Sequence, residues 1–278
     1  FRDNLKNGLA ITGSGISENS NLPILKNVLI KTVNDKIQLI TTNLELAITK
    51  NISGKIIETG ALTIPYNTFY NIVTNINQDR INLEKNNNNF IVKTDNYEAK
   101  IQSVSEDEFP LIPKLENNEN YLEIDSIILK DSLNKVLPAA QISEIRPEIS
   151  GVLFDFQLTI LKLAATDSFR LAEKTINTNQ LKHNFNKSFK VIVPLKTVQE
   201  LVRIFPNDQP IKIYLDNNQI LFKNNDIELI SRLIDGVYPD YEPIIPKQIE
   251  TELVVNRDHF INSVKLVNNF SGKTYDIR

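Results

Sequence analysis

The sequence predicts an α+β protein built from tandem copies of one domain, each with antiparallel strands and two helices. Internal repetition is the main observation. Thr42-Asn43 recurs as Thr166-Asp167, 124 positions on (166 − 42), and Ile64-Pro65 recurs as Val193-Pro194, 129 positions on (193 − 64). Solenoid repeats are only ~20–50 residues long, so a period of this size indicates whole domains in tandem.

The first copy reads as a helix, four strands, a second helix and a three-stranded hairpin array. Pro65 precedes apolar residues spaced as on one helix face: Phe69, Ile72, Val73 and Ile76. The asparagine run 86–89 is expected to be a hairpin turn. The other expected elements are a first helix capped by Asp3, strands at 25–32, 36–42, 44–52 and 64–66, and hairpin strands at 80–84, 90–94 and 98–104.

The polar stretch 114–120 is expected to be a linker, after which the pattern restarts. The second copy should hold a strand at 121–129, a helix from Asp131, strands to 174, a helix at 195–204 and strands to 233. A second linker at 248–250 precedes a strand at 253–255, a helix from Asp258 to 267 and the start of a strand at 275–278. Asp3 thus matches Asp131 and Asp258, which predicts domains at 1–118 (first strand missing), 119–248 and 249–278 (truncated).

Composition excludes several classes of protein. The chain has 278 residues, no cysteine, and 31 Lys+Arg against 34 Asp+Glu, a net charge of −3. It has no disulfide framework, no apolar run of ~18 residues and no signal peptide, so a cytoplasmic protein without a membrane segment is expected.

Catalytic motifs are absent as well. The sequence contains no P-loop, GxGxxG, HExxH or paired metal-ligand spacing, so neither a metal nor another cofactor is expected, and an enzyme is disfavoured. His183 and His259 have no nucleophile at a recognisable spacing and are expected to be structural surface residues. Thr166-Asp167 is better explained as a turn that caps its own backbone, since its counterpart Thr42-Asn43 has no carboxylate.

Two features suggest binding. Lysines on the first helix of each copy and basic residues on the second helix of copy two could meet phosphates, although solvated helix faces explain them equally well. The proline-punctuated segment 238–246 carries Tyr238, Tyr241 and two isoleucines. It could cover a surface and form a groove, or be a linker that packs on its own sheet.

Eight segments, in the same order along nearly the whole chain, resemble the bacterial DNA polymerase III β subunit family, the β sliding clamps. They are NLPILKNVLIK (21–31), TTNLELAI (41–48), TIPYNTFYNIV (63–73), EDEFPLIP (106–113), EIRPEISGVLFD (144–155), LAATDSFRLAEK (163–174), VIVPLKTVQELVRIF (191–205) and SRLIDGVYPDYEPIIP (231–246). The resemblance implies three clamp domains per chain and two chains closing a ring around duplex DNA, with helices inside and sheets outside. It also implies a non-catalytic processivity factor that tethers the polymerase III catalytic subunit, the clamp loader and other proteins with a clamp-binding motif.

The resemblance also assigns residues. DNA-facing cations would be Lys6, Lys135, Arg146, Lys196 and Arg203. A partner-peptide pocket would be lined by Ile149, Thr166, Ser168, Phe169, Arg170, Leu171, Pro239 and Ile244. The homodimer contact would join Ala99 and Ile101 to Phe270.

Some positions depart from the family pattern. Phe169 is larger and less polar than expected, Pro243 stands where many clamps have arginine, and Glu18-Asn19-Ser20 replaces a loop that is usually basic. The 278 residues alone are not expected to close a ring. The competing interpretation is a peptide-binding scaffold of the same repeat that does not encircle DNA; a nucleic-acid enzyme is a more distant third.

Overall fold

Two compact units make up the chain, Phe1–Tyr238 and Pro239–Arg278. The computed structural model describes residues 1–17, 21–115 and 119–272. The first unit contains two copies of the repeat, and the described part of the second contains an α-helix at Arg257–Asn268 and a 3₁₀ helix at Glu242–Ile244. Three sequence expectations fall at least partly outside the described residues. They concern the loop 18–20, which differs from the family pattern, the linker 114–120 and the strand at 275–278.

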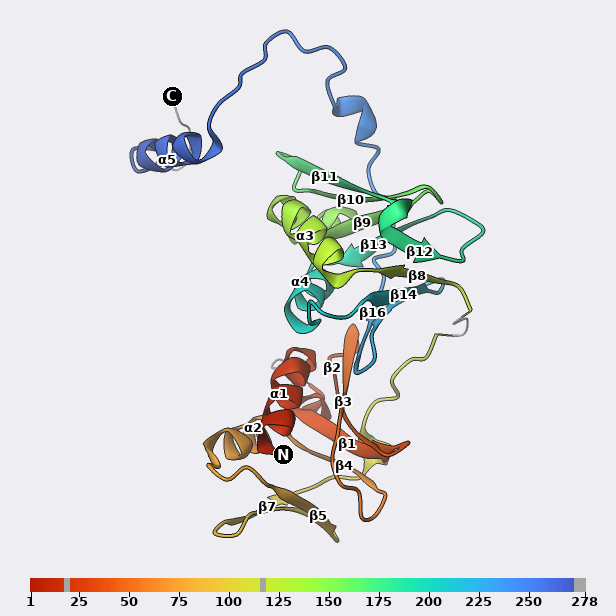
Figure 1. Ribbon diagram of the computed structural model, residues 1–278, viewed down its shortest axis with the longest axis vertical. Coiled ribbons are helices and arrows are strands. Elements are labelled where there is room, and N and C mark those ends of the chain that lie inside the picture. Colours follow the sequence, from red (N-terminus) through yellow and green to blue (C-terminus); the bar gives the residue numbers. More distant parts are fainter. Residues whose placement is uncertain (18–20, 116–118, 273–278) are drawn as a thin grey trace. The chain divides into compact units, whose positions relative to one another are not determined.

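Both repeats in the first unit share a common order of elements, to which the second adds the strands β8 and β12 (Figure 1). The first consists of α1 (Arg2–Thr12), β1 (Asn27–Val33), β2 (Lys36–Thr42), β3 (Leu46–Ile52), β4 (Ala61–Pro65), α2 (Tyr66–Asn75), β5 (Asn82–Asn86), β6 (Asn89–Lys93) and β7 (Glu98–Gln102). The second consists of β8 (Tyr121–Ile124), α3 (Ser126–Val136), β9 (Gly151–Phe156), β10 (Ile160–Thr166), β11 (Leu171–Asn177), β12 (Leu181–His183), β13 (Phe189–Pro194), α4 (Leu195–Ile204), β14 (Ile211–Leu215), β15 (Gln219–Lys223) and β16 (Ile227–Arg232).

A nine-stranded sheet joins the two repeats, with strand order β12-β8-β14-β15-β16-β3-β2-β1-β4. Its central pair is β3 of the first repeat and β16 of the second, antiparallel, with Leu229 opposite Ile48 and Ile230 opposite Ala47. A four-stranded sheet, β11-β10-β9-β13, and a three-stranded sheet, β5-β6-β7, complete the unit. Main-chain hydrogen bonding therefore runs without a break from one repeat to the next.

The four helices of the first unit lie along one side of these sheets (Figure 1). Each repeat has a core between its helices and strands, and the core of the second repeat also takes in Leu46 and Ile48 of β3. In the first, Leu9, Ile64, Phe69 and Val73 are fully buried, as the i, i+3, i+4 spacing in α2 predicts. In the second, the core is larger and includes Phe154, Phe156, Phe205 and Phe222.

The start of α3 corrects the sequence prediction. The strand ends at Ile124, not Leu129, and α3 begins at Ser126 because the side chain of Asp125 accepts a hydrogen bond from the backbone N–H of Ile127. Asp125, not Asp131, is the N-cap. When the two helices are aligned by their buried leucines, Leu9 corresponds to Leu133, 124 positions on (133 − 9). This is the same offset that relates Thr42 to Thr166 in the strands. The expected match of Asp3 with Asp131 was wrong by one helical turn.

Two other expected elements also differ. Asp3 lies within the first turn of α1, whose N-cap position is Phe1, so it faces the positive end of the helix dipole and does not cap the helix. In the second unit, residues 253–255 form no strand, since no described strand lies beside them, and α5 (Arg257–Asn268) is capped by Asn256, not by Asp258. Of the helices formed by described residues, none has the length and apolar character needed to span a membrane.

Candidate functional site

A five-residue turn between β10 and β11 builds one side of the candidate site. The hydroxyl of Thr166 accepts a hydrogen bond from the N–H of Ser168 (3.1 Å) and donates one to the carbonyl of Arg170 (2.8 Å). The Asp167 carboxylate accepts from the N–H groups of Phe169 and Arg170, both at 3.0 Å, and these bonds, led by that from Phe169, lower the pKa of Asp167. Asp167 therefore organises the turn.

The corresponding turn of the first repeat has the same bonds. Thr42 accepts from the N–H of Leu44 at 3.1 Å, and Asn43 accepts from Glu45 and Leu46 at 3.0 and 2.9 Å. The self-capping turn expected for both copies is confirmed. Both turns require a left-handed residue at the third position, Leu44 (φ 75°) and Ser168 (φ 77°). Neither is glycine, so both turns carry backbone strain.

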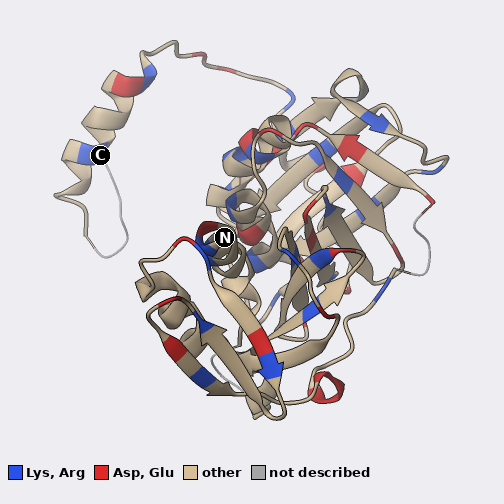
Figure 2. Cartoon of the chain, turned by 60° about the horizontal axis from the view of Figure 1, so that its bottom comes forward, with Lys and Arg blue, Asp and Glu red and all other residues tan. Residues whose placement is uncertain are grey.

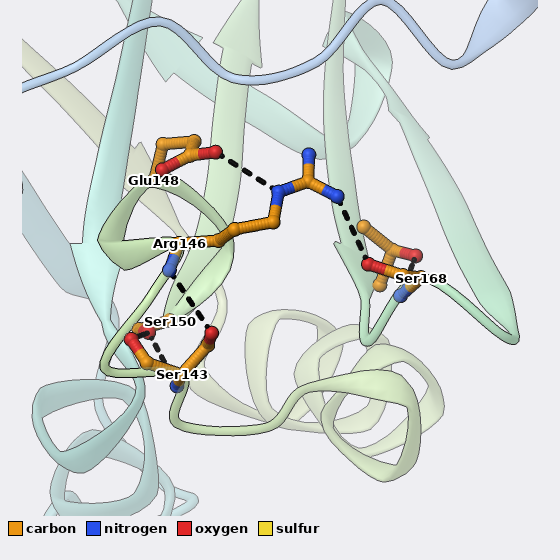
Figure 3. Close-up of polar contacts among 6 residues, drawn as sticks. Ser143, Arg146, Glu148, Ser150 and Ser168 are labelled. Carbon is orange, nitrogen blue, oxygen red and sulfur yellow. Dashed lines mark hydrogen bonds and ion pairs between the residues drawn. The ribbon is translucent and has the colours of Figure 1, made fainter.

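Arg146 connects this turn to a neighbouring loop (Figure 3). Its guanidinium donates to the hydroxyl of Ser168 (Nη1–Oγ 3.1 Å) and to the carboxylate of Glu148 (Nε–Oε1 3.2 Å). Arg146 therefore lies with the expected pocket residues. Its expected contact with DNA stays a prediction.

The loop that carries Arg146 is closed on itself. The hydroxyl of Ser150 accepts from the N–H of Ser143 (2.8 Å) and donates to the Ser143 carbonyl (3.0 Å), and the hydroxyl of Ser143 accepts from the N–H of Arg146 (3.1 Å). Figure 3 shows these bonds at the base of the loop. The closed loop leaves Ile145 92% exposed at its tip.

The end of the first unit contributes a third wall that sequence reasoning did not assign residue by residue. The Tyr238 side chain is half-buried, and this burial raises the pKa of its hydroxyl to about 12. A hydrogen bond with the backbone of Thr166 has a smaller effect in the opposite direction. Gly236 has φ +149°, and a Cβ there would come within 3.3 Å of the Cβ of Glu148. Only the YPDY motif in the sequence pointed to this segment.

The expected pocket residues have different environments. Ile149 is buried in the wall, Thr166 and Leu171 are half-buried, and Phe169 is 97% exposed. Arg170 is exposed and pairs with Asp167 at 2.9 Å. Pro239 and Ile244 belong to the second unit, where Pro239 is half-buried and Ile244 exposed.

The expected DNA-facing cations are not equally available. Arg203, on α4, donates to the carbonyls of Ala10 and Ile11 at the C-terminus of α1 (3.3 Å each), to the hydroxyl of Ser14, and to Glu200 (2.7 Å). It acts as a C-terminal cap for a helix of the other repeat. Sequence analysis missed this role because the acceptors are about 190 positions away.

Other cations cap helices in the same way. Lys130, on α3, donates to the carbonyl of Phe205 (2.9 Å) and to the side chain of Asn207 (2.7 Å) just beyond α4. Arg2 donates to the carbonyls of Val73 and Thr74 at the end of α2. Together with Arg203, these side chains link α3 to α4, α4 to α1 and α1 to α2.

The remaining expected cations divide into two groups. Lys135 forms an ion pair with Asp131 one turn earlier (2.7 Å). Lys6 and Lys196 form no hydrogen bond or ion pair that the structure records with another described residue. Among the described residues, no group of three or more acidic or histidine side chains could hold a metal ion.

Neither histidine forms a catalytic arrangement. His183 lies in β12, not in a loop; its ring packs edge-on against Phe156, and its Nε2 is 3.2 Å from the carbonyl oxygen of Leu158. His259 is exposed on α5.

Two of the expected dimer residues, Ala99 and Ile101, lie in β7, an edge strand of the three-stranded sheet among the described residues. Ala99 is half-buried, whereas Ile101 is 6% exposed and packs in the core of the first repeat with Phe90 and Val92. At this edge Ile101 can therefore offer only its backbone, because its side chain is already buried. Phe270 is exposed in the second unit.

Head-to-tail α+β repeats that share a sheet, carry helices on one side and keep strand edges open define a clamp-type protein. The N-terminal-domain model of the DNA polymerase III beta subunit matches residues 1–113, and the central-domain model matches residues 123–240. The chain belongs to the DNA polymerase III beta subunit family, the beta sliding clamps.

Individual relatives agree with this assignment. The beta sliding clamp of Chlamydia muridarum is 26% identical over 275 residues, which are 98% of this chain and 74% of that protein. The crystal structure of the Bacillus subtilis DNA polymerase sliding clamp superposes with a TM-score of 0.92 at 26% identity, covering 98% of this chain and 73% of that one. The Helicobacter pylori beta clamp bound to a DNA ligase peptide superposes with a TM-score of 0.88 at 21% identity, over 97% and 75% of the two chains.

Proposed function

We propose that this protein works as a ring-shaped clamp that encircles duplex DNA and tethers other replication proteins to it. The observation that carries the proposal is the junction of β3 with β16. Here the last strand of the second repeat, β16, pairs with the third strand of the first repeat, β3. The same two positions recur as free edges. β11, which corresponds to β3, and β7, which corresponds to β16, each have one partner strand among the described residues.

A junction of this kind is heterologous, because the two surfaces that meet are different. Heterologous junctions repeated with a constant rotation close into rings. A third repeat that begins near α5 would meet β11 through its own last strand, and its β3-like strand would meet β7 of a second chain. We accordingly propose domains at 1–118, 119–248 and 249–278, a homodimeric ring, and a contact in which the backbone of Ala99–Ile101 and the side chain of Phe270 take part.

Ring closure is tested by topology. The full-length gene product, loaded on closed circular DNA by a clamp loader, should stay bound at high salt and be released when the circle is cut once. Retention that does not depend on whether the DNA is circular or linear would contradict the ring and favour a scaffold that does not encircle DNA.

We also propose that the loop 143–150, the turn 166–171 and the segment 234–238 form a docking site for apolar partner peptides, with Pro239 and Ile244 nearby in sequence. Buried Ile149, half-buried Leu171 and exposed Phe169 supply apolar surface, and both arginines on the walls already have acidic partners. The Helicobacter pylori clamp carries a DNA ligase peptide, which shows that this fold can serve such a purpose. The polymerase III catalytic subunit, the clamp loader and DNA ligase are the proposed partners, and the protein itself is proposed to be non-catalytic.

Peptide docking is tested by fluorescence anisotropy with a fluorescein-labelled DNA ligase peptide. We expect saturable binding that is weakened by Phe169→Ala, whereas Leu44→Ala, in the matching turn of the first repeat, should leave the affinity unchanged. Equal affinity of all three proteins would remove the turn 166–171 from the proposed site.

A further inference from the structure

We propose that the helical side of this chain contacts duplex DNA mainly through neutral asparagine and glutamine side chains, with few direct cation–phosphate contacts. The inference rests on the proposed clamp function and specifies the chemistry of its DNA contact. It starts from a shortage: of the five cations expected to face DNA, three are already bonded within the protein.

These three have definite partners. Arg203 caps α1 and pairs with Glu200, Lys135 pairs with Asp131, and Arg146 is held by Glu148 and Ser168. A phosphate would have to compete with the carboxylate that already pairs with each of these cations, so each adds less net positive charge to the side facing DNA. Lys6 and Lys196 are the expected cations without such a competing bond among those recorded for the described residues.

The exposed stripe of α2 carries amides where α4 carries a cation. Asn67, Asn71 and Asn75 are all exposed and lie one helical turn apart, opposite the buried Phe69 and Val73. The Asn75 amide already uses one N–H within the helix, where it donates to the carbonyl of Asn71 (2.8 Å). Residues four apart lie above one another on a helix, so these asparagines form a continuous row.

The equivalent row on α4 is mixed. Asn67 corresponds to Lys196 at the offset of the second helices (196 − 67 = 129), and Gln199 is exposed beside it. Arg203 corresponds to Thr74, so the capping bond to another helix has no counterpart in α2. The two second helices thus share a polar stripe that differs in charge.

The first helix of each repeat also exposes amide side chains. Exposed side chains there include Asn4 and Asn7 on α1 and Asn134 on α3. Figure 2 shows Lys and Arg interspersed with Asp and Glu over the helices and strands of the first unit. The helices α1–α4 carry six Lys and Arg against three Asp and Glu, although the whole chain has a net charge of −3. Four of the six, Arg2, Lys130, Lys135 and Arg203, already cap a helix or pair with an acid.

Such a surface suits movement along DNA. A side-chain NH₂ group donates hydrogen bonds to phosphate oxygens but releases no counterions, so each contact is weak and independent of base sequence. Two phosphate-neutralising lysines predict a loss of binding of about 12-fold between roughly 50 and 200 mM salt, whereas five cations predict about 500-fold.

The test uses the ¹⁵N-labelled chain and a fluorescent 20-base-pair duplex of mixed sequence. Side-chain NH₂ signals of Asn67 and Asn71 should shift on addition of duplex, and that of Asn217, in a sheet turn, should not. The double variant Asn67→Ala/Asn71→Ala should bind the duplex ~3–10-fold more weakly with an unchanged salt dependence, as expected for the loss of two neutral hydrogen bonds. Lys196→Gln should instead make the salt dependence shallower, and Asn217→Ala should change neither property.

The outcomes separate the inference from the function on which it rests. Binding that falls about 500-fold over the same salt range and is unaffected by the double asparagine variant would overturn the amide contact and leave the clamp proposal standing. If neither amide nor backbone signals of α1–α4 move with duplex, the proposed DNA-facing side is wrong, and the inference is wrong with it.

Discussion

The guanidinium of Arg203, in the second repeat, donates a hydrogen bond to the carbonyl oxygen of Ile11, at the end of the first helix of the first repeat (3.3 Å). This contact lies between helices, while β3 and β16 join the same two repeats through their sheet. The junction is thus held by both layers, and a residue expected to bind DNA has a structural role.

We therefore predict that Arg203→Ala destabilises the first unit by about 1–2 kcal/mol, because the C-terminal carbonyls of α1 lose a charged donor in a half-exposed site. Thermal unfolding should show the loss, and hydrogen exchange should increase at the end of α1. Lys196→Ala on the same helix is the matched control and should leave both unchanged. Equal stability of the two variants would show that the recorded bonds contribute nothing.

Tyr66 gives the same region a predicted pH dependence. Its hydroxyl donates to the carbonyl of Leu9 (2.8 Å), and burial, together with the neighbouring Tyr70, raises its pKa to about 12, while Arg203 acts in the opposite direction. Above pH ~10 the unfolded chain loses this proton and the folded chain keeps it, so stability decreases as pH rises from about 10 to 12. The contribution lost is about 1–3 kcal/mol.

Urea unfolding at pH values of about 9, 10.5 and 11.5 measures this effect. Tyr66→Phe should be less stable than the unmodified protein at pH ~9, because the Leu9 carbonyl loses its donor, but should lose less stability as pH rises. If the two proteins lose the same stability between these pH values, Tyr66 does not titrate as stated.

Much of this fold could be predicted from the sequence, because local patterns determine it. The repeat, the strands and α2 follow from spacing within one element, and the polar turns at 42–46 and 166–170 follow from side chains that bond their own backbone. The start of α3 could not be predicted, since Ile127–Leu129 is apolar and β-branched in part and both Asp125 and Asp131 are good caps.

The hydrogen-bond partners of Arg203 and Arg146 could not be predicted from the sequence for another reason. An arginine on an exposed helix face looks the same in sequence whether its acceptor is a phosphate or a distant carbonyl. Arg203 and Arg146 find partners 192 and 22 positions away, so only the folded chain identifies them. Residues 253–255 form no strand because a strand needs a partner strand, which the apolar run Leu-Val-Val cannot supply by itself.

The matching turns allow a controlled experiment on backbone strain. Leu44→Gly should stabilise the first unit by about 1 kcal/mol, because glycine adopts a φ of 75° without the strain that leucine has there. The leucine side chain forms no hydrogen bond, so none is lost. Ser168→Gly relieves the same strain but loses the bond from Arg146, so its gain should be smaller. Differential scanning calorimetry of the two variants gives the comparison, and a larger gain for Ser168→Gly would mean that the Arg146 bond has no stabilising value.

The bond between Arg146 and Ser168 also predicts an effect on peptide docking. Ser168→Ala removes the acceptor hydroxyl and frees Arg146 from the turn, so the loop 143–150 and the turn 166–171 are no longer tied together. We expect the DNA ligase peptide to bind ~2–10-fold more weakly, since one hydrogen bond that preorganises the site is lost. Arg146→Ala should have a similar effect, and the double variant should be no weaker than Arg146→Ala alone if the two residues act through this one bond. A double variant whose losses add in full would show instead that each side chain contacts the peptide independently.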